Sequence, residues 1–305
     1  MRVKSPARGN LWLLIFAVWF IFIALLTQGP LSGLSAVAMP AFMQIVGVFV
    51  PFLAYLFLTK QKPKAALAWR PLNARNALLT VIVSVAALPM ILLVAHLTSF
   101  FVISTVDFGT TVDPAAFSIW AMLLTGVAFP VLFEEILLRG AIFGEYYGHK
   151  NSASIGVTIA VTALFFGFMH VNFHQAIYAT MFGVVFGCLV YYTRSIIAPI
   201  LGHFIVNASF GLLGYLTAFG SFMGDLSAGD TRPLLIILGA NAVMLPIMII
   251  CLKKLQSYHI ATQEKYEPVF EMSEKPKVFT WALWVALAIF IALSIMQEMS
   301  MRAAL

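Results

Sequence analysis

Two adjacent glutamates, Glu134 and Glu135, lie within a stretch of mostly apolar residues that runs from Gly126 to Leu138. Burying a carboxylate among apolar groups is costly, so such a pair is retained for a function or is held by a partner. Arg139 follows Glu135 by four residues, the favourable helical spacing for an ion pair. We therefore expect Glu135 and Arg139 to pair, while Glu134 faces a cavity as a general base. An inert network of all three charges is the alternative.

Two further apolar segments carry polar side chains at helical spacing. Phe166 precedes His170 by four residues, so the ring can pack against the imidazole and restrict its rotamers. His203 and Asn207 are also four residues apart and share one helical face. A lone histidine on an apolar helix is more often a core residue than a catalyst. Together, however, a carboxylate, two imidazoles and an amide can activate water and stabilise an oxyanion.

To form one site, these side chains must lie at the same depth in the membrane. Counted at about 1.5 Å per residue from the connector near 148–151, Glu134 and His170 lie roughly 21 and 27 Å along their segments. An antiparallel hairpin can therefore bring them together. His203 and Asn207 lie only roughly 11 to 17 Å from the end of their own segment. Tilted helices or a dipping connector are required to remove this difference.

Composition defines the class of protein that contains these segments. Apolar residues make up 62% of the 305 residues and charged residues 10%, and the mean hydropathy is +0.97. A soluble domain has roughly 25% charged residues, so this chain is predicted to be an integral, multi-pass membrane protein. Its fold class is all-α, a transmembrane bundle of about nine helices. The apolar runs are 11–27, 37–59, 76–104, 115–147, 152–171, 175–192, 196–218, 233–252 and 278–297.

Basic residues in the connectors predict the orientation of the bundle. The leader before residue 11, the connector 60–75 and the connector 253–277 are rich in lysine and arginine, and alternating helices place all three on one side. The positive-inside rule assigns that side, and the N-terminus, to the cytoplasm. An odd number of helices leaves the C-terminus outside. The net charge of +6 then reflects topology and anionic lipid, and it gives no reason to expect a nucleic-acid partner.

The three motifs together resemble a known signature. Glu134-Glu135-x-x-x-Arg139, Phe166-x-x-x-His170 and His203-x-x-x-Asn207 occur in this order inside membrane segments. They resemble the signature of the CPBP family of intramembrane proteases, which includes the type II CAAX prenyl endopeptidases and the bacteriocin-immunity (Abi) proteins. The resemblance covers about 115–215. It suggests a division into N-terminal helices over 1–110, a protease-like core over 111–220, and C-terminal helices over 221–305.

The resemblance implies roles for six residues. Glu134, helped by His170, would activate the attacking water. His203 and Asn207 would hold the oxyanion of the tetrahedral intermediate. Glu135 and Arg139 would organise the site.

Zinc is an alternative that the residues leave open. His170 and His174 have the i, i+4 spacing of zinc ligands if the helix continues that far, although the glutamate of an HExxH motif is missing. We expect His174 to be an interfacial polar residue. A zinc ion held by Glu134, His170 and His203 also stays open. The ligand set favours a glutamate mechanism without a cofactor.

Three functions are compatible with the sequence. The first is hydrolysis of a peptide bond in or beside the membrane, with a peptide or a membrane protein as substrate, including CAAX-type processing. The second is a proton-coupled transporter, because intramembrane Glu and His also form proton relays. The third is a non-catalytic immunity or scaffold protein that binds a partner peptide. In a prokaryote the protein would lie in the plasma membrane.

Overall fold

The computed structural model describes residues 4–103, 118–214, 220–222, 225, 230–262 and 276–304. Within these ranges the chain is helical and contains no strand, which confirms the all-α class. Seven described helices are long and apolar enough to cross a membrane, and two more apolar helices are shorter. They correspond to the nine predicted runs, and the protein is an integral, multi-pass membrane protein. The proposed boundary at residue 110 lies outside the described residues.

The membrane helices follow one another with short connections. The unbroken long helices are Pro6–Gln28 (α1), Ala74–Ser99 (α5), Phe173–Thr193 (α10), Thr231–Ala261 (α13) and Trp281–Ala304 (α15). The two shorter apolar helices are Ile155–Phe168 (α9) and Ile197–Leu213 (α11). A four-residue helix, Pro63–Ala66 (α4), lies in the connector between α3 and α5.

Two spans contain π-helical turns. The span Ala38–Thr59 consists of Ala38–Phe42 (α2), Met43–Phe49 (η1) and Val50–Thr59 (α3). The span Ile119–Tyr146 consists of Ile119–Ala121 (α6), Met122–Ala128 (η2), Phe129–Glu135 (α7), Ile136–Ile142 (η3) and Phe143–Tyr146 (α8).

Prolines account for two of the three π-helical segments. Pro51 lies two residues after η1, and Pro130 lies two residues after η2. Proline has no N–H to donate and its ring clashes with the carbonyl four residues earlier, so the preceding turn widens. The segments η2 and η3 flank α7, whose last two residues are Glu134 and Glu135. The glutamate pair therefore sits on a short α-helical segment between two widened ones.

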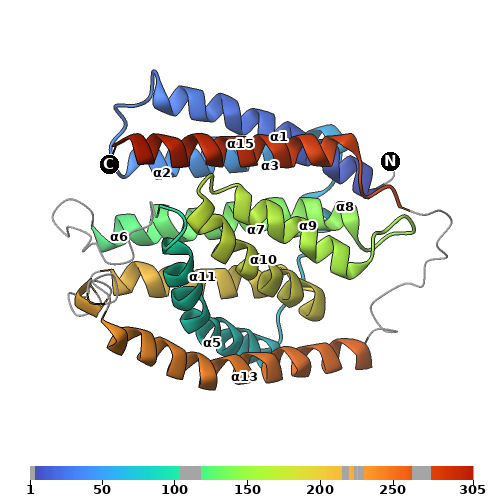
Figure 1. Ribbon diagram of the computed structural model, residues 1–305. Coiled ribbons are helices and arrows are strands. Elements are labelled where there is room, and N and C mark those ends of the chain that lie inside the picture. The colour runs from blue at the N-terminus through green and yellow to red at the C-terminus, as the bar shows by residue number, and fades with distance from the viewer. Residues whose placement is uncertain are drawn as a thin grey trace.

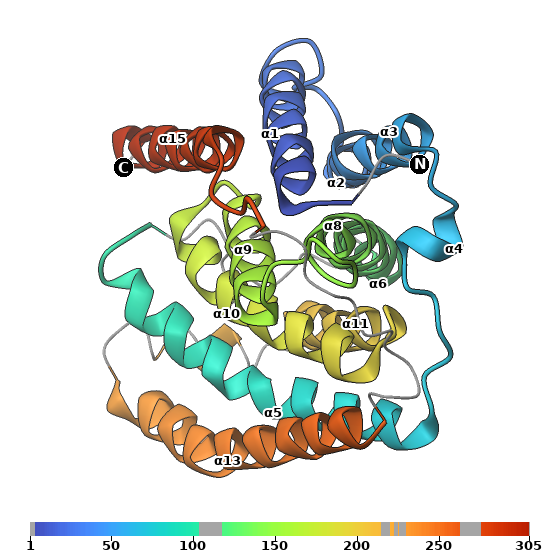
Figure 2. The same ribbon diagram turned by 90° about the vertical axis from the view of Figure 1, so that its right-hand side faces the viewer.

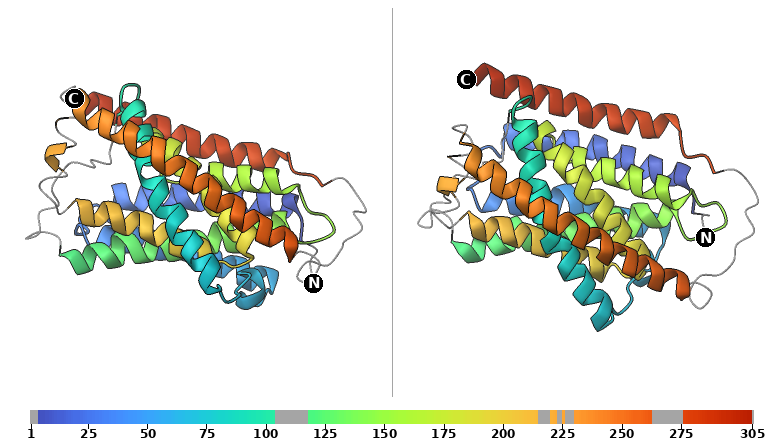
Figure 3. Two further views of the ribbon diagram at one scale, coloured as in Figure 1. Left: turned by 90° about the horizontal axis from the view of Figure 1, so that it is seen from below. Right: turned by 60° about the horizontal axis from the view of Figure 1, so that its bottom comes forward.

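The helices form three layers (Figure 1). Helices α1 and α15 pack side by side above a middle layer that contains α7, α9 and α10, and α5 packs against α13 below it. Figure 2 views the bundle from the N-terminal end. In this view α1, α3 and α15 lie in the upper part, and α8, α9 and α11 lie below them. Figure 3 shows α5 crossing the bundle at a steep tilt. The middle layer holds the site residues and is covered on both sides.

The two marked ends of the chain lie at opposite ends of the bundle (Figure 1), as an odd number of spans requires. The leader, the connector after α3 and the end of α13 lie at the N-terminal end, so the three basic segments do share a side. Assignment of that side to the cytoplasm stays a prediction.

Candidate active site

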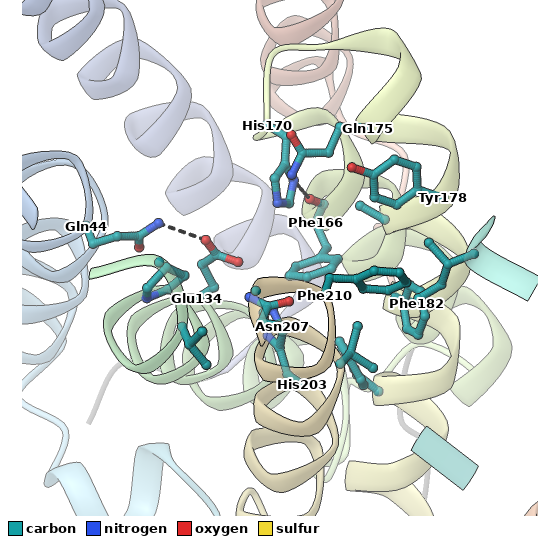
Figure 4. A pocket seen from close by; sticks show the side chains of 18 of the residues that line it. Gln44, Glu134, Phe166, His170, Gln175, Tyr178, Phe182, His203, Asn207 and Phe210 are labelled. Atoms are coloured by element: carbon teal, nitrogen blue, oxygen red, sulfur yellow. Dashed lines mark hydrogen bonds between the residues drawn. The ribbon is translucent and has the colours of Figure 1, made fainter. Parts of the chain in front are cut away.

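Glu134 lines a cavity of about 350 Å³ inside the bundle, and only 4% of its surface is exposed. His170, which follows α9, and His203 and Asn207, both on α11, line the same cavity (Figure 4). The predicted meeting of the α7 and α9 segments with α11 is therefore found in the structure. Apolar side chains form much of the remaining wall: Ile91, Val127, Phe182, Val206 and Phe210.

A buried connector explains how α11 reaches the depth of the other segments. Ser195 and Ile196, just before α11, are fully buried. The Ser195 hydroxyl donates to the carbonyl oxygen of Arg70 at 2.6 Å, so the connector between α3 and α5 lies over this turn. Helix α11 thus begins below the surface of the bundle. Its seventh and eleventh residues, His203 and Asn207, are deeper than a count along the sequence suggests.

The two carboxylate oxygens of Glu134 have different surroundings. Oε1 accepts a hydrogen bond from Nε2 of Gln44 at 2.9 Å. Oε2 is buried and has no hydrogen-bond partner among the described residues. Gln44 was not among the predicted site residues, although an amide within the apolar run 37–59 was the available signal. The arrangement fixes one oxygen of Glu134 and leaves the other for a water molecule in the cavity.

The predicted ion pair between Glu135 and Arg139 is present. Nη1 of Arg139 lies 3.0 Å from Oε1 of Glu135, and both side chains are fully buried. The same carboxylate oxygen accepts from Nδ1 of His203 at 3.0 Å, a contact that the sequence did not predict. Nη2 of Arg139 donates to the carbonyl oxygen of Gly183 at 3.2 Å. This network connects η3 and α7 to α10 and α11 beside the cavity.

Aromatic rings hold the two histidines. The Phe166 ring meets the His170 ring edge-on at 5.4 Å and the His203 ring edge-on at 5.3 Å, measured between ring centroids. The Phe186 ring stacks on His203 at 5.0 Å. The Arg139 guanidinium lies 4.3 Å from the Phe166 ring centroid, a cation–π contact. The predicted packing of Phe166 against His170 is confirmed, and the same ring also restricts His203.

Hydrogen bonds fix which nitrogen of His170 faces the cavity. His170 Nδ1 lies 2.7 Å from the carbonyl oxygen of Phe166. A carbonyl oxygen only accepts, so Nδ1 carries the hydrogen and Nε2 is left for the cavity. By the same argument, His203 Nδ1 donates to Glu135. Each histidine is thus anchored through Nδ1, with Nε2 left for chemistry.

The described structure does not form the i, i+4 pair on one helix that His170 and His174 would need as zinc ligands. Among the described residues, no three His, Cys, Asp or Glu side chains come close enough together to hold a metal ion. His170 and His174 are not on one helix, because α9 ends at Phe168 and Val171 has a φ of 53°. His174 is also buried, not interfacial, and bonds through Nε2 to the Ala95 carbonyl oxygen at 2.8 Å.

Comparison with known proteins agrees with the site. Residues 116–209 match the model of a family described as type II CAAX prenyl endopeptidase Rce1-like. No curated protein and no solved structure matches the chain. A multi-pass helical bundle with buried acid and imidazole groups in one cavity, together with this match, supports the general class of intramembrane proteases. Residues 116–209, which carry the site, are thus similar to this type II CAAX prenyl endopeptidase family, in agreement with the resemblance of the three motifs.

Proposed function

We propose that the protein is an endopeptidase that uses Glu134 to activate water for hydrolysis of a peptide bond in or beside the membrane. The observation that carries this proposal is that Oε2 of Glu134 has no hydrogen-bond partner among the described residues and lies on a cavity shared with His170, His203 and Asn207. A buried carboxylate oxygen without a protein donor is suited to accept a proton from water. The family match supports proteolysis as the general activity.

In the proposed reaction, Oε2 of Glu134 takes a proton from a water molecule that attacks the peptide carbonyl carbon. His170 Nε2 orients this water by accepting its second hydrogen. Glu134 then gives the proton to the leaving amine, which breaks the C–N bond and regenerates the carboxylate. Oε1, held by Gln44, keeps the carboxylate in one orientation through both transfers.

The tetrahedral intermediate places a negative charge on the former carbonyl oxygen, and His203 and Asn207 are proposed to stabilise it. Because Nδ1 of His203 already donates to Glu135, Nε2 can also donate only when the ring is cationic. Glu135 holds the ring in place through Nδ1, and Arg139 holds the same carboxylate oxygen. Glu135 and Arg139 act as positioning residues in this scheme.

The proposed substrate is an extended segment of a peptide or membrane protein, because a helix keeps its carbonyl groups in internal hydrogen bonds. The apolar wall of the cavity suits an apolar side chain next to the scissile bond. A prenylated CAAX-type peptide is the first substrate to test, since the matched family is described by that activity.

The test separates three functions in one preparation. The purified protein is reconstituted in liposomes and assayed for cleavage of a membrane-peptide library and for proton uptake. Cleavage without proton uptake supports the proposal. Proton uptake without cleavage would favour a carrier, and binding of a peptide without either activity would favour an immunity or scaffold protein.

A further inference from the structure

A second cavity, of about 690 Å³, opens at the end of the bundle that carries the N-terminus. Figure 2 shows this end, with α4 lying beside α8. The wall is formed by the leader, the α4 connector, α8 with the turn that follows it, and the end of α10. Arg139 is the one lining residue that also belongs to the buried network beside the first cavity. The two cavities are therefore neighbours separated by that network.

The second cavity is strongly basic. Five lysine and arginine side chains are among its described lining residues, and none of these residues is an aspartate or glutamate. They are Lys4, Lys64, Arg70, Arg139 and Arg194. Lys64 and Arg70 are exposed on the connector, so they can approach a ligand from the water side. Arg139 is ion-paired with the buried Glu135, so the excess of positive charge that favours an anion comes from the other four lining residues.

The nearest buried acid does not neutralise this charge. Glu145 is fully buried, and Arg8 donates to its carboxylate through Nε and Nη2, both at 2.7 Å. The hydroxyl of Tyr55 donates to the same carboxylate at 2.6 Å. Glu145 is thus already matched by a cation of its own, Arg8. Burial lowers the pKa of Lys4, and the nearby Glu145 carboxylate partly offsets this by favouring the charged ammonium.

Aromatic and small residues give the cavity an amphipathic wall. Trp69 and Tyr147 line it together with Phe143, which is typical of the interface between hydrocarbon and headgroups. A Cβ atom at Gly144 would lie 3.4 Å from Nζ of Lys4, so the glycine leaves room beside the charge. An apolar wall next to a cationic cluster matches a molecule with both an acyl portion and an anionic head.

We propose that this cavity binds the phosphate headgroup of an anionic phospholipid from the leaflet on the N-terminal side. Basic pockets between membrane helices bind such headgroups through charge and hydrogen bonds. The lipid would contact both α4, Pro63–Ala66, and α8, Phe143–Tyr146, which are distant in sequence. Binding would stabilise this end of the bundle.

The experiment measures thermal unfolding of the full chain in zwitterionic detergent with increasing phosphatidylglycerol, phosphatidylcholine or inorganic phosphate. The test variant is Lys64→Gln with Arg70→Gln. Its matched control is Lys62→Gln with Lys253→Gln, which removes the same charge from exposed residues that do not line the cavity. A second variant, Gly144→Leu, keeps every charge and fills the space.

We expect phosphatidylglycerol to raise the unfolding midpoint of the native chain and of the control. The test variant should need at least roughly tenfold more phosphatidylglycerol than the native chain for the same increase in the unfolding midpoint. The midpoint of Gly144→Leu should not respond to this lipid. An equal response of test and control would overturn the proposal, because diffuse surface charge would explain it. Equal stabilisation by phosphatidylcholine, or full stabilisation by inorganic phosphate alone, would also overturn it.

Discussion

Gln44 Nε2 and Glu134 Oε1 are 2.9 Å apart, and this hydrogen bond links the span Ala38–Thr59 to the span Ile119–Tyr146. Gln44 lies outside the segment that matches the protease family. An early membrane helix therefore supplies the group that orients the proposed general base. The bond also distinguishes the two oxygens of Glu134, since Oε2 is the one without a described partner.

Substitution Gln44→Leu should lower kcat by roughly tenfold or more and leave KM nearly unchanged, because a hydrogen bond to a charged group contributes about 1.5–3 kcal/mol. The measurement is steady-state cleavage of a peptide by the purified protein. Gln175→Leu is the matched control, since Gln175 lines the same cavity and has no described bond to Glu134. Equal kcat values for the two variants would contradict a positioning role for Gln44.

The buried pair predicts an asymmetric effect on stability. Arg139→Leu leaves the Glu135 carboxylate buried without its arginine, and we expect a loss of about 3–5 kcal/mol in the free energy of unfolding. The double variant Arg139→Leu with Glu135→Leu should lose less than the single variant, because no uncompensated charge remains. Thermal or denaturant unfolding in detergent measures both. A double variant less stable than Arg139→Leu would show that the pair is not the source of the loss.

Stability should depend on pH through His149, in the turn between α8 and α9. Burial lowers the pKa of His149. Its Nε2 donates to the carbonyl oxygen of Glu145 at 2.8 Å, and Nδ1 accepts from the N–H of Asn151 at 3.2 Å, so the neutral ring is satisfied. His149 therefore binds a proton more tightly in the unfolded chain than in the folded protein. The contribution of His149 to the free energy of unfolding is fully present above the ordinary histidine pKa of about 6.5 and declines as the pH falls below it.

The measurement is the unfolding midpoint at pH 7.5 and 5.5 for the native chain and for His149→Gln. Glutamine can donate to the Glu145 carbonyl oxygen and does not titrate. We expect the drop between the two pH values to be smaller in the variant. A drop of the same size in both proteins would assign the pH dependence to other groups.

Local patterns were predicted correctly from the sequence. The ion pair of Glu135 with Arg139 and the packing of Phe166 on His170 depend on a four-residue helical spacing, which survives the π-helical turn after α7. The number of spans follows from the lengths of the apolar runs. The four-residue spacing and the length of an apolar run can each be read from a single segment of the sequence.

Long-range relationships could not be predicted in the same way. The bond from Gln44 to Glu134 joins residues 90 positions apart, and the bond from His203 to Glu135 joins residues 68 positions apart. Glu145 lies near the end of the apolar run 115–147, yet it is fully buried and pairs with Arg8, 137 positions away. Nothing in a single helical repeat specifies these partners.

The proposed activation of water by Glu134 without a metal ion is tested by peptide cleavage with purified Glu134→Gln in detergent. Glu298→Gln, which makes the same change at a residue outside the cavity, is the control. Both variants must unfold like the native chain. We expect Glu134→Gln to lose cleavage, while the native chain and the control keep it in a chelator. Cleavage retained by Glu134→Gln would rule out Glu134 as the general base, and cleavage lost by the native chain in chelator and restored by zinc would show that a metal ion is required.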